Sequence, residues 1–307
     1  MNIATLLAAC LRMATPLTLA GLGEAYSERA GIMNIGVEAI MLCGAFSGFM
    51  FTFWTGSVLV GIIAAMVAGM LISFLHAVLS IKCLANQNIV VLALNFFALG
   101  LTSFLFLKAF GQSTTLPKLA STAGTIAIPG LSQIPLLGPV LFNQNLFVYL
   151  MLVLVAVFMV LFYKTEWGVN LTAVGEHPRA ADTAGLNVFR TRYVACLVNG
   201  LLGGLAGSYV TLAQLGFFME DVTAGKGYMA LVAVILGRRN PVGILLASLL
   251  IGFAEAMQFQ LQTMGIPLPS QVFSTIPYVA AVLVLLFSIS KSSNPSALGV
   301  PYERDKR

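Results

Sequence analysis

Charge is scarce in this chain. Asp, Glu, Lys and Arg make up 9% of its 307 residues, whereas apolar residues make up 59%. The mean hydropathy is +0.94, which a soluble domain of this length could not carry without aggregating. Several apolar runs reach the ~18–20 residues that a helix needs to cross a hydrocarbon core of ~30 Å. The sequence therefore predicts an all-α, polytopic transmembrane helical bundle.

Groups for metal or redox chemistry are also few. The chain has two histidines and four cysteines, and the cysteines lie in separate apolar segments without a C-x-x-C pair. Thiols in such surroundings behave as small hydrophobic groups, so no metal site is expected. The net charge of +5 is spread over short loops and the C-terminal tail. This distribution gives no concentrated basic face for nucleic acid.

A nucleotide-binding loop is missing as well. Gly225-Lys226 resembles part of the pattern G-x-x-x-x-G-K-[ST], but Glu220 and Gly227 stand where the pattern needs its first Gly and its Ser or Thr. The hydrolase patterns G-x-S-x-G and H-E-x-x-H are absent too. We therefore expect a chain that is not an enzyme and that holds no cofactor of its own.

The charges that are present gather in residues 21–48, between apolar flanks. An ionisable group at membrane depth must be paired or hydrated, and backbone broken by glycine survives there only if it is buried or lines a cavity. Residues 225–241 form a second apolar segment shortened by glycine. Transporters place their sites where such segments meet, so the pattern predicts a solute pathway with broken or re-entrant segments.

The candidate pathway residues each leave an alternative open. Asn34 and Glu38 would share one helix face, either lining the pathway or forming an internal pair with Arg29. Asn95 is either a pathway group or an interhelical hydrogen bond, and Glu255 belongs either to an outer vestibule or to the polar end of a helix. The full set of candidates is Glu24, Arg29, Asn34, Glu38, Asn95 and Glu255.

Topology follows from the positions of Lys and Arg. Basic residues in the loop 164–192 and in the tail 291–307 place both in the cytoplasm, and the C-terminus with them. The long polar connection 111–144 is then extracytoplasmic. We expect one transmembrane permease-like domain over residues 1–307 with eight to ten spans, and leave the side of the N-terminus open.

Three stretches carry a family resemblance. They are Gly23 to Ala45, Gly175 to Val188 and Pro295 to Glu303, including Ser-Glu-Arg-Ala-Gly at 27–31 and Asn-Ile-Gly-Val-Glu at 34–38. Together they resemble the permease subunit of bacterial ABC importers for nucleosides and simple sugars, a family related to the ribose and branched-chain amino-acid permeases. Ala39 departs from the family pattern, which usually has Gly there.

The resemblance implies a function and a set of partners. The chain would be one permease subunit of an ATP-binding cassette importer, carrying a nucleoside or a similar small polar solute into the cell across the bacterial cytoplasmic (inner) membrane. Its partners would be a second permease subunit, an ABC ATPase subunit that binds the ATP, and an extracytoplasmic solute-binding lipoprotein. Lipid surrounds it, and nucleic acid plays no part.

The loop 164–192 is the second informative stretch. Pro178 and Gly185 bracket a stretch of residues that favours a short helix. From spacing alone, this helix is equally a connector or a docking helix. The resemblance implies the coupling helix that sits on the ATPase. The residues implied in coupling are Glu176, His177, Arg179, Asp182, Gly185 and Asn187.

Two other function classes remain as hypotheses. A proton-coupled secondary transporter would use Glu38 or Glu255 as its proton site and would need no partner protein. A membrane scaffold or receptor would show no transport at all. Transport by the reconstituted chain alone, driven by a proton gradient, would identify the first of these.

Overall fold

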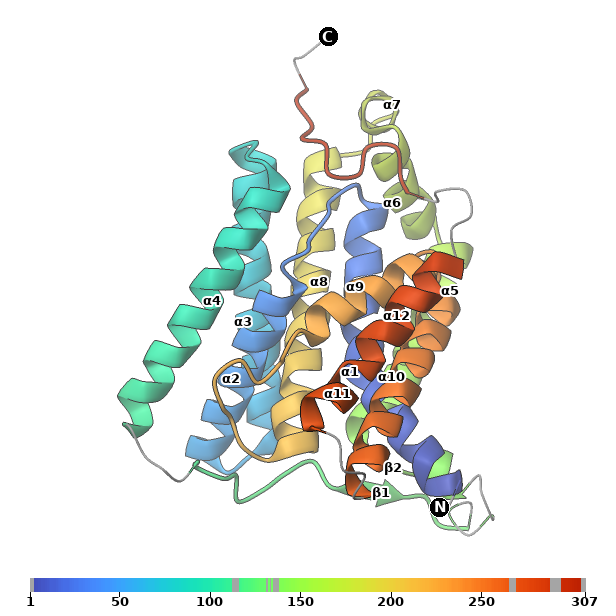
Figure 1. The fold of residues 1–307 in the computed structure, drawn as a ribbon. Coiled ribbons are helices and arrows are strands. Elements are labelled where there is room, and N and C mark those ends of the chain that lie inside the picture. Colours follow the sequence, from blue (N-terminus) through green and yellow to red (C-terminus); the bar gives the residue numbers. More distant parts are fainter. Residues whose placement is uncertain are drawn as a thin grey trace.

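Helices of membrane-spanning length form most of the chain in a computed structural model (Figure 1), which describes residues 3–111, 116–130, 132, 134, 138–264, 269–287 and 294–304. Seven described helices are long and apolar enough to cross a membrane: α1 (Ile3–Arg29), α2 (Val37–Thr55), α3 (Val58–Ala77, extended by a π-helical turn to Lys82), α4 (Gln87–Phe110), α5 (Leu146–Lys164), α8 (Val188–Tyr209, extended likewise to Leu215) and α10 (Pro241–Thr263). The prediction of an all-helical polytopic bundle is confirmed.

Shorter elements complete the fold. They are α6 (Glu166–Glu176), α7 (Pro178–Thr183), α9 (Lys226–Leu236), α11 (Ser270–Ser274), α12 (Ile276–Phe287), a π-helical turn at Gly138–Phe142, and the strands β1 (Thr125–Ala127) and β2 (Asn143–Asn145). The sequence predicted eight to ten spans; the described residues contain seven helices of spanning length and two shorter apolar ones, α9 and α12. Lys291, Lys306 and Arg307, which contributed to the predicted orientation of the tail, lie outside the described residues.

Both glycine-containing segments break the helices, as predicted. After α1 ends at Arg29, the chain turns through residues 30–36, where Gly31 has a φ of +85°, and α2 then begins at Val37. Gly225, with a φ of +80°, precedes α9 in the same way. Glycine adopts this conformation without the steric cost that a Cβ atom would add. Figure 1 shows α2 and α9 starting within the bundle and not at its ends.

Glycines on α8 allow three helices to approach closely. A Cβ atom on Gly200 would lie 2.6 Å from the carbonyl oxygen of Gly69 on α3, and one on Gly44 of α2 would lie 2.6 Å from the backbone of Gly204. Helices without side chains at the contact gain van der Waals packing that lipid cannot replace. The two G-x-x-x-G pairs of α8 therefore serve packing, as predicted.

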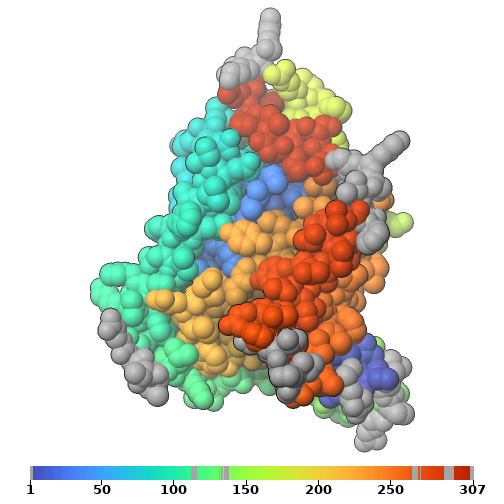
Figure 2. Space-filling model, viewed as in Figure 1, coloured from blue at the N-terminus to red at the C-terminus, as the bar shows by residue number. Residues whose placement is uncertain are grey.

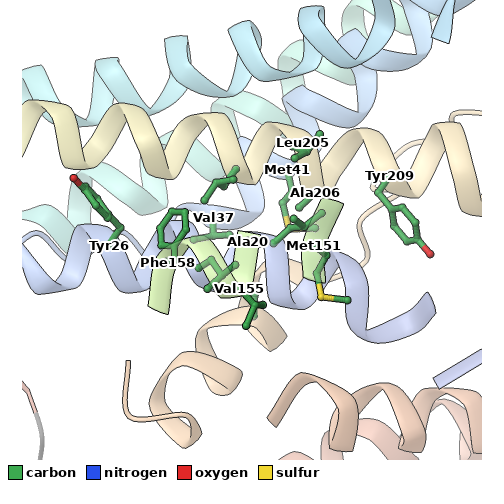
Figure 3. Packing of buried hydrophobic residues seen from close by; sticks show 14 of the residues in the cluster. Ala20, Tyr26, Val37, Met41, Met151, Val155, Phe158, Leu205, Ala206 and Tyr209 are labelled. Atoms are coloured by element: carbon green, nitrogen blue, oxygen red, sulfur yellow. The ribbon is translucent and has the colours of Figure 1, made fainter. Parts of the chain in front are cut away.

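The largest apolar cluster among the described residues joins α1, α2, α5 and α8, with one buried residue each from α6 and α9. Figure 3 shows Tyr26 of α1 beside Phe158 of α5, and Met41 of α2 near Leu205 of α8. The outer surfaces are apolar as well: Phe96 of α4 is 75% exposed. Apolar side chains on both the inside and the outside are what a bilayer requires of a helical bundle.

The two ends of the bundle differ. One end, called here the hairpin end, carries β1 and β2, which pair antiparallel with Ile126 opposite Gln144. The opposite end, called here the tail end, carries α6, α7 and the C-terminal residues 294–304 (Figure 1). In Figure 2 the red atoms of this tail cover the bundle beside α7.

Candidate functional site

Glu38 ties the start of α2 to the start of α9. Its carboxylate is 7% exposed and accepts three hydrogen bonds: from Thr223 Oγ1 at 2.5 Å, from the Gly227 N–H at 2.6 Å and from the Gly225 N–H at 3.0 Å. The first N–H groups of a helix have no partner within the helix and carry partial positive charge. A buried carboxylate is therefore stabilised here by the N-terminus of α9.

A second carboxylate holds the break between α1 and α2. Glu24 is fully buried and accepts from the Asn34 N–H at 2.9 Å and from the Asn199 amide of α8 at 2.6 Å. Asn34 Oδ1 in turn accepts from the Gly36 N–H at 3.1 Å. Glu24 and Asn34, both candidates from the sequence, thus lie together and order the turn before α2.

Arg29 lies elsewhere. Its guanidinium donates to the carbonyl of Arg239 at 3.0 Å and to Tyr163 Oη at 3.0 Å, and it sits 4.1 Å from the ring centroid of Phe162. The adjacent Glu28 forms a buried ion pair with the Arg239 side chain. The Arg29–Glu38 pair, one of the alternatives from the sequence, is not formed, because Arg29 closes α1 at the tail end while Glu38 points to α9.

Asn95 connects three helices. Its Oδ1 accepts from the Ala39 N–H of α2 at 3.1 Å, and its amide donates to Tyr228 Oη of α9 at 3.0 Å. Glu38 and Asn95 therefore hold the same pair of helix starts, α2 and α9, from two sides. Both carboxylate oxygens of Glu38 and the amide oxygen of Asn95 accept a hydrogen bond.

A cavity of about 510 Å³ lies between α1, the end of α8, α9, α10 and α12. An ion pair between Lys226 of α9 and Glu255 of α10 lines it, with side chains 16% and 15% exposed. The remaining lining residues are Met13, Leu17, Val210, Gln214, Leu215, Val222, Ala224, Met229, Ile251, Gln258, Phe259, Ser274, Pro277 and Tyr278. Among the sequence candidates, Glu255 alone borders this cavity.

Lys226 was missed from the sequence. Gly225-Lys226 drew attention only as a fragment of a nucleotide-binding loop, although a lysine at the start of a short apolar helix is itself a signal of a functional site. The structure shows that Gly225 and Gly227, on either side of Lys226, both donate to Glu38. Glu38 thus stands behind the cavity wall and fixes the backbone from which Lys226 extends.

The predicted coupling residues lie at the tail end. The expected short helix is present as α7, and Gly185 follows it with a φ of +91°. Asn187 caps α8 by accepting from the Arg190 N–H at 2.9 Å. His177 and Arg179 line a groove of about 630 Å³ whose other wall is tail residues 300–303.

The tail is fastened across this end by backbone and side-chain contacts. Asp182 of α7 accepts from Arg304 at 2.8 Å and from Tyr302 Oη at 3.0 Å, while Glu176 accepts from Ser296 Oγ at 2.8 Å. The Gly299 N–H donates to the carbonyl of Gly31 at 3.1 Å. The tail therefore connects α7 with the break between α1 and α2.

Helices that begin inside an apolar bundle and meet beside a cavity holding an ion pair define a class of protein, the membrane transporters built on broken helices. Residues 6–289 match the family described as branched-chain amino acid transport system / permease component, and the chain belongs to this family.

Relatives match along nearly the whole chain. The chain is 35% identical to the guanosine ABC transporter permease protein NupQ of Bacillus subtilis, covering 97% of this chain and 96% of that protein. It is 36% identical to the nucleoside ABC transporter permease protein NupC of Lactococcus lactis (95% and 94% covered). It is 34% identical to the protein named "Putative glucose ABC transporter permease protein TsgC13" of Haloferax volcanii (98% and 98% covered). A solved metal-chelate type ABC transporter in an inward-facing conformation shares the fold, with a TM-score of 0.51 and 13% identity over 92% of this chain and 85% of the other.

Proposed function

We propose that this chain is a permease subunit of an ABC importer that carries a nucleoside into a bacterial cell. The observation that carries the proposal is full-length similarity, at 35% and 36% identity, to permease proteins named for guanosine and nucleoside transport. The glucose relative at 34% identity keeps a simple sugar as the competing solute. Sequence identity does not distinguish a nucleoside from a sugar as the solute, so the distinction must come from the chemistry of the site.

The proposal includes three partners and an orientation. A second permease subunit completes the pathway, an ABC ATPase binds the ATP, and an extracytoplasmic binding protein delivers the solute. Four basic residues belong to elements that meet at the tail end: Lys164 ends α5, Arg179 is on α7, Arg190 is in the first turn of α8, and Arg304 contacts Asp182 of α7. The positive-inside rule assigns this end to the cytoplasm. In this orientation α7 meets the ATPase, and the hairpin end meets the binding protein.

A proton-coupled mechanism finds less support. A proton site needs a carboxylate that exchanges its proton with the pathway. Glu24 and Glu38 are buried and accept hydrogen bonds from the protein, and Glu255 is paired with Lys226. We therefore assign the energy source to ATP hydrolysis by the partner subunit.

The test is solute uptake by bacterial cells that lack their own nucleoside transport and that express the whole complex. Radiolabelled guanosine, uridine, ribose and glucose are supplied separately, with cells lacking only this chain as the control. We expect accumulation of nucleosides that depends on this chain. Accumulation of glucose or ribose alone would refute the nucleoside assignment, and no accumulation by a complex shown to be assembled would refute transport.

A further inference from the structure

The Lys226–Glu255 ion pair is the starting point. It lies within an apolar bundle, where taking two charges out of water is costly, and replacing such a pair by apolar side chains of similar size is often neutral or stabilising. The fold alone therefore does not account for the pair. Both side chains face the cavity of about 510 Å³, so they present an ammonium donor and a carboxylate acceptor side by side to whatever enters it.

Hydrogen bonds with two other helices fix the backbone around Lys226. Glu38 accepts hydrogen bonds from the N–H groups of Gly225 and Gly227, on either side of Lys226. Tyr278 Oη also donates to the carbonyl of Ala224 at 3.3 Å, which fastens the chain two residues before Lys226 to α12. The backbone is thus held from two sides at the point where the lysine enters the cavity.

The rest of the wall combines apolar surface with two amides. Met13, Leu17, Met229 and Ile251 supply apolar and polarisable surface, and Phe259 adds an aromatic ring. Gln258 lies one helical turn beyond Glu255, so both belong to the cavity face of α10. The amide of Gln214 donates at 3.4 Å to the sulfur of Met13, which is a weak acceptor that a solute oxygen would readily replace.

We propose that this cavity is the solute-selecting site of the chain and that it takes a neutral nucleoside, whose base is read by Lys226 and Glu255; the proposal rests on the proposed function. The pair has no net charge, so an ionic solute would leave a charge uncompensated. A nucleobase offers neighbouring N–H donors and O or N acceptors on one flat edge, and its faces suit the apolar wall. The volume falls within the range of about 300–1,000 Å³ typical of small-molecule sites. A free sugar has no flat apolar face to set against this wall, so more of its hydroxyl groups would lie against apolar side chains without hydrogen bonds.

The test compares four versions of the assembled complex in proteoliposomes, with the binding protein at a fixed concentration and the guanosine concentration varied. They are the wild type, the single variant Glu255→Gln, the double variant Lys226→Met with Glu255→Leu, and a control, Lys108→Met with Glu220→Gln. The control also removes one cation and one anion, but from exposed positions outside the cavity. Measurements are the folded amount of each complex, the KM and maximal rate of guanosine uptake, and competition by uridine, ribose and glucose.

We expect the control to match the wild type. Glu255→Gln should raise the KM for guanosine about tenfold or more, because one hydrogen bond to a charged group is lost. The double variant should remain folded and lose guanosine uptake, because apolar substitution preserves packing but not recognition. Guanosine uptake at wild-type KM by the double variant would overturn the proposal, and so would failure of that variant to fold, since the pair would then serve the structure. Failure of the nucleoside assignment itself is recognised separately, by a wild-type complex that transports no nucleoside.

Discussion

Glu38 offers the sharpest test of how the start of α2 is joined to the start of α9. In Glu38→Gln one carboxylate oxygen becomes an amide NH₂, which donates hydrogen bonds and does not accept them. Three donors converge on the carboxylate, from Thr223, Gly225 and Gly227, so at least one of them loses its acceptor. A buried donor without a partner costs about 1–3 kcal/mol, and the lost charge at the start of α9 costs about 0.3–2 kcal/mol more.

The assay is thermal unfolding of the purified chain in detergent, with Glu220→Gln as the matched control because Glu220 is exposed and lies in the same connection before α9. We expect a clearly lower unfolding midpoint for Glu38→Gln and an unchanged midpoint for the control. Neutralising Arg29 as well should not restore stability, because Arg29 contacts the carbonyl of Arg239 and not Glu38. A wild-type midpoint in Glu38→Gln, or rescue by Arg29→Gln, would refute the described role of Glu38.

Three further outcomes are expected. Gly200→Ala should destabilise the folded chain by about 1–3 kcal/mol in chemical unfolding, because its Cβ would lie 2.6 Å from a backbone oxygen of α3. Gly100→Ala should not destabilise the chain, because a Cβ there would have no atom within 4 Å. Equal effects of the two substitutions would contradict the packing argument. Asp182→Lys should lower solute-stimulated ATPase activity of the complex with little change in stability, since the pair with Arg304 is a surface pair worth about 0–1 kcal/mol. Adding Arg304→Asp should restore this activity. If activity is not restored, Asp182 acts without the tail. The purified chain alone should hydrolyse no ATP, and activity that persists through further purification would count against the subunit assignment.

The sequence allowed local features to be predicted. Glycines among charges indicated the break before α2, the short apolar run indicated α9, and Pro178 with Gly185 bracketed α7. Each of these depends on the conformational preference of a few neighbouring residues. Helix–helix proximity was predictable where small residues recur on one face, as at Gly200 on α8.

Contacts between distant residues were not predictable in this way. Periodicity shows that Glu38 lies on one face of α2, but it does not show that the start of α9, 185 or more residues later, lies opposite. The same holds for the cavity, whose ion pair joins two different helices. The pairing of β1 with β2 was also missed, because strands of three residues carry too little alternation to be recognised.

The most direct test of the account is the energy source of transport. Proteoliposomes are prepared with the chain, its second permease subunit, the ATPase and the binding protein, and guanosine uptake is measured with ATP on the ATPase side, with a non-hydrolysable analogue, and with a proton gradient alone. The account predicts guanosine accumulation with ATP and none under the other two conditions. Guanosine accumulation driven by the proton gradient alone would contradict it.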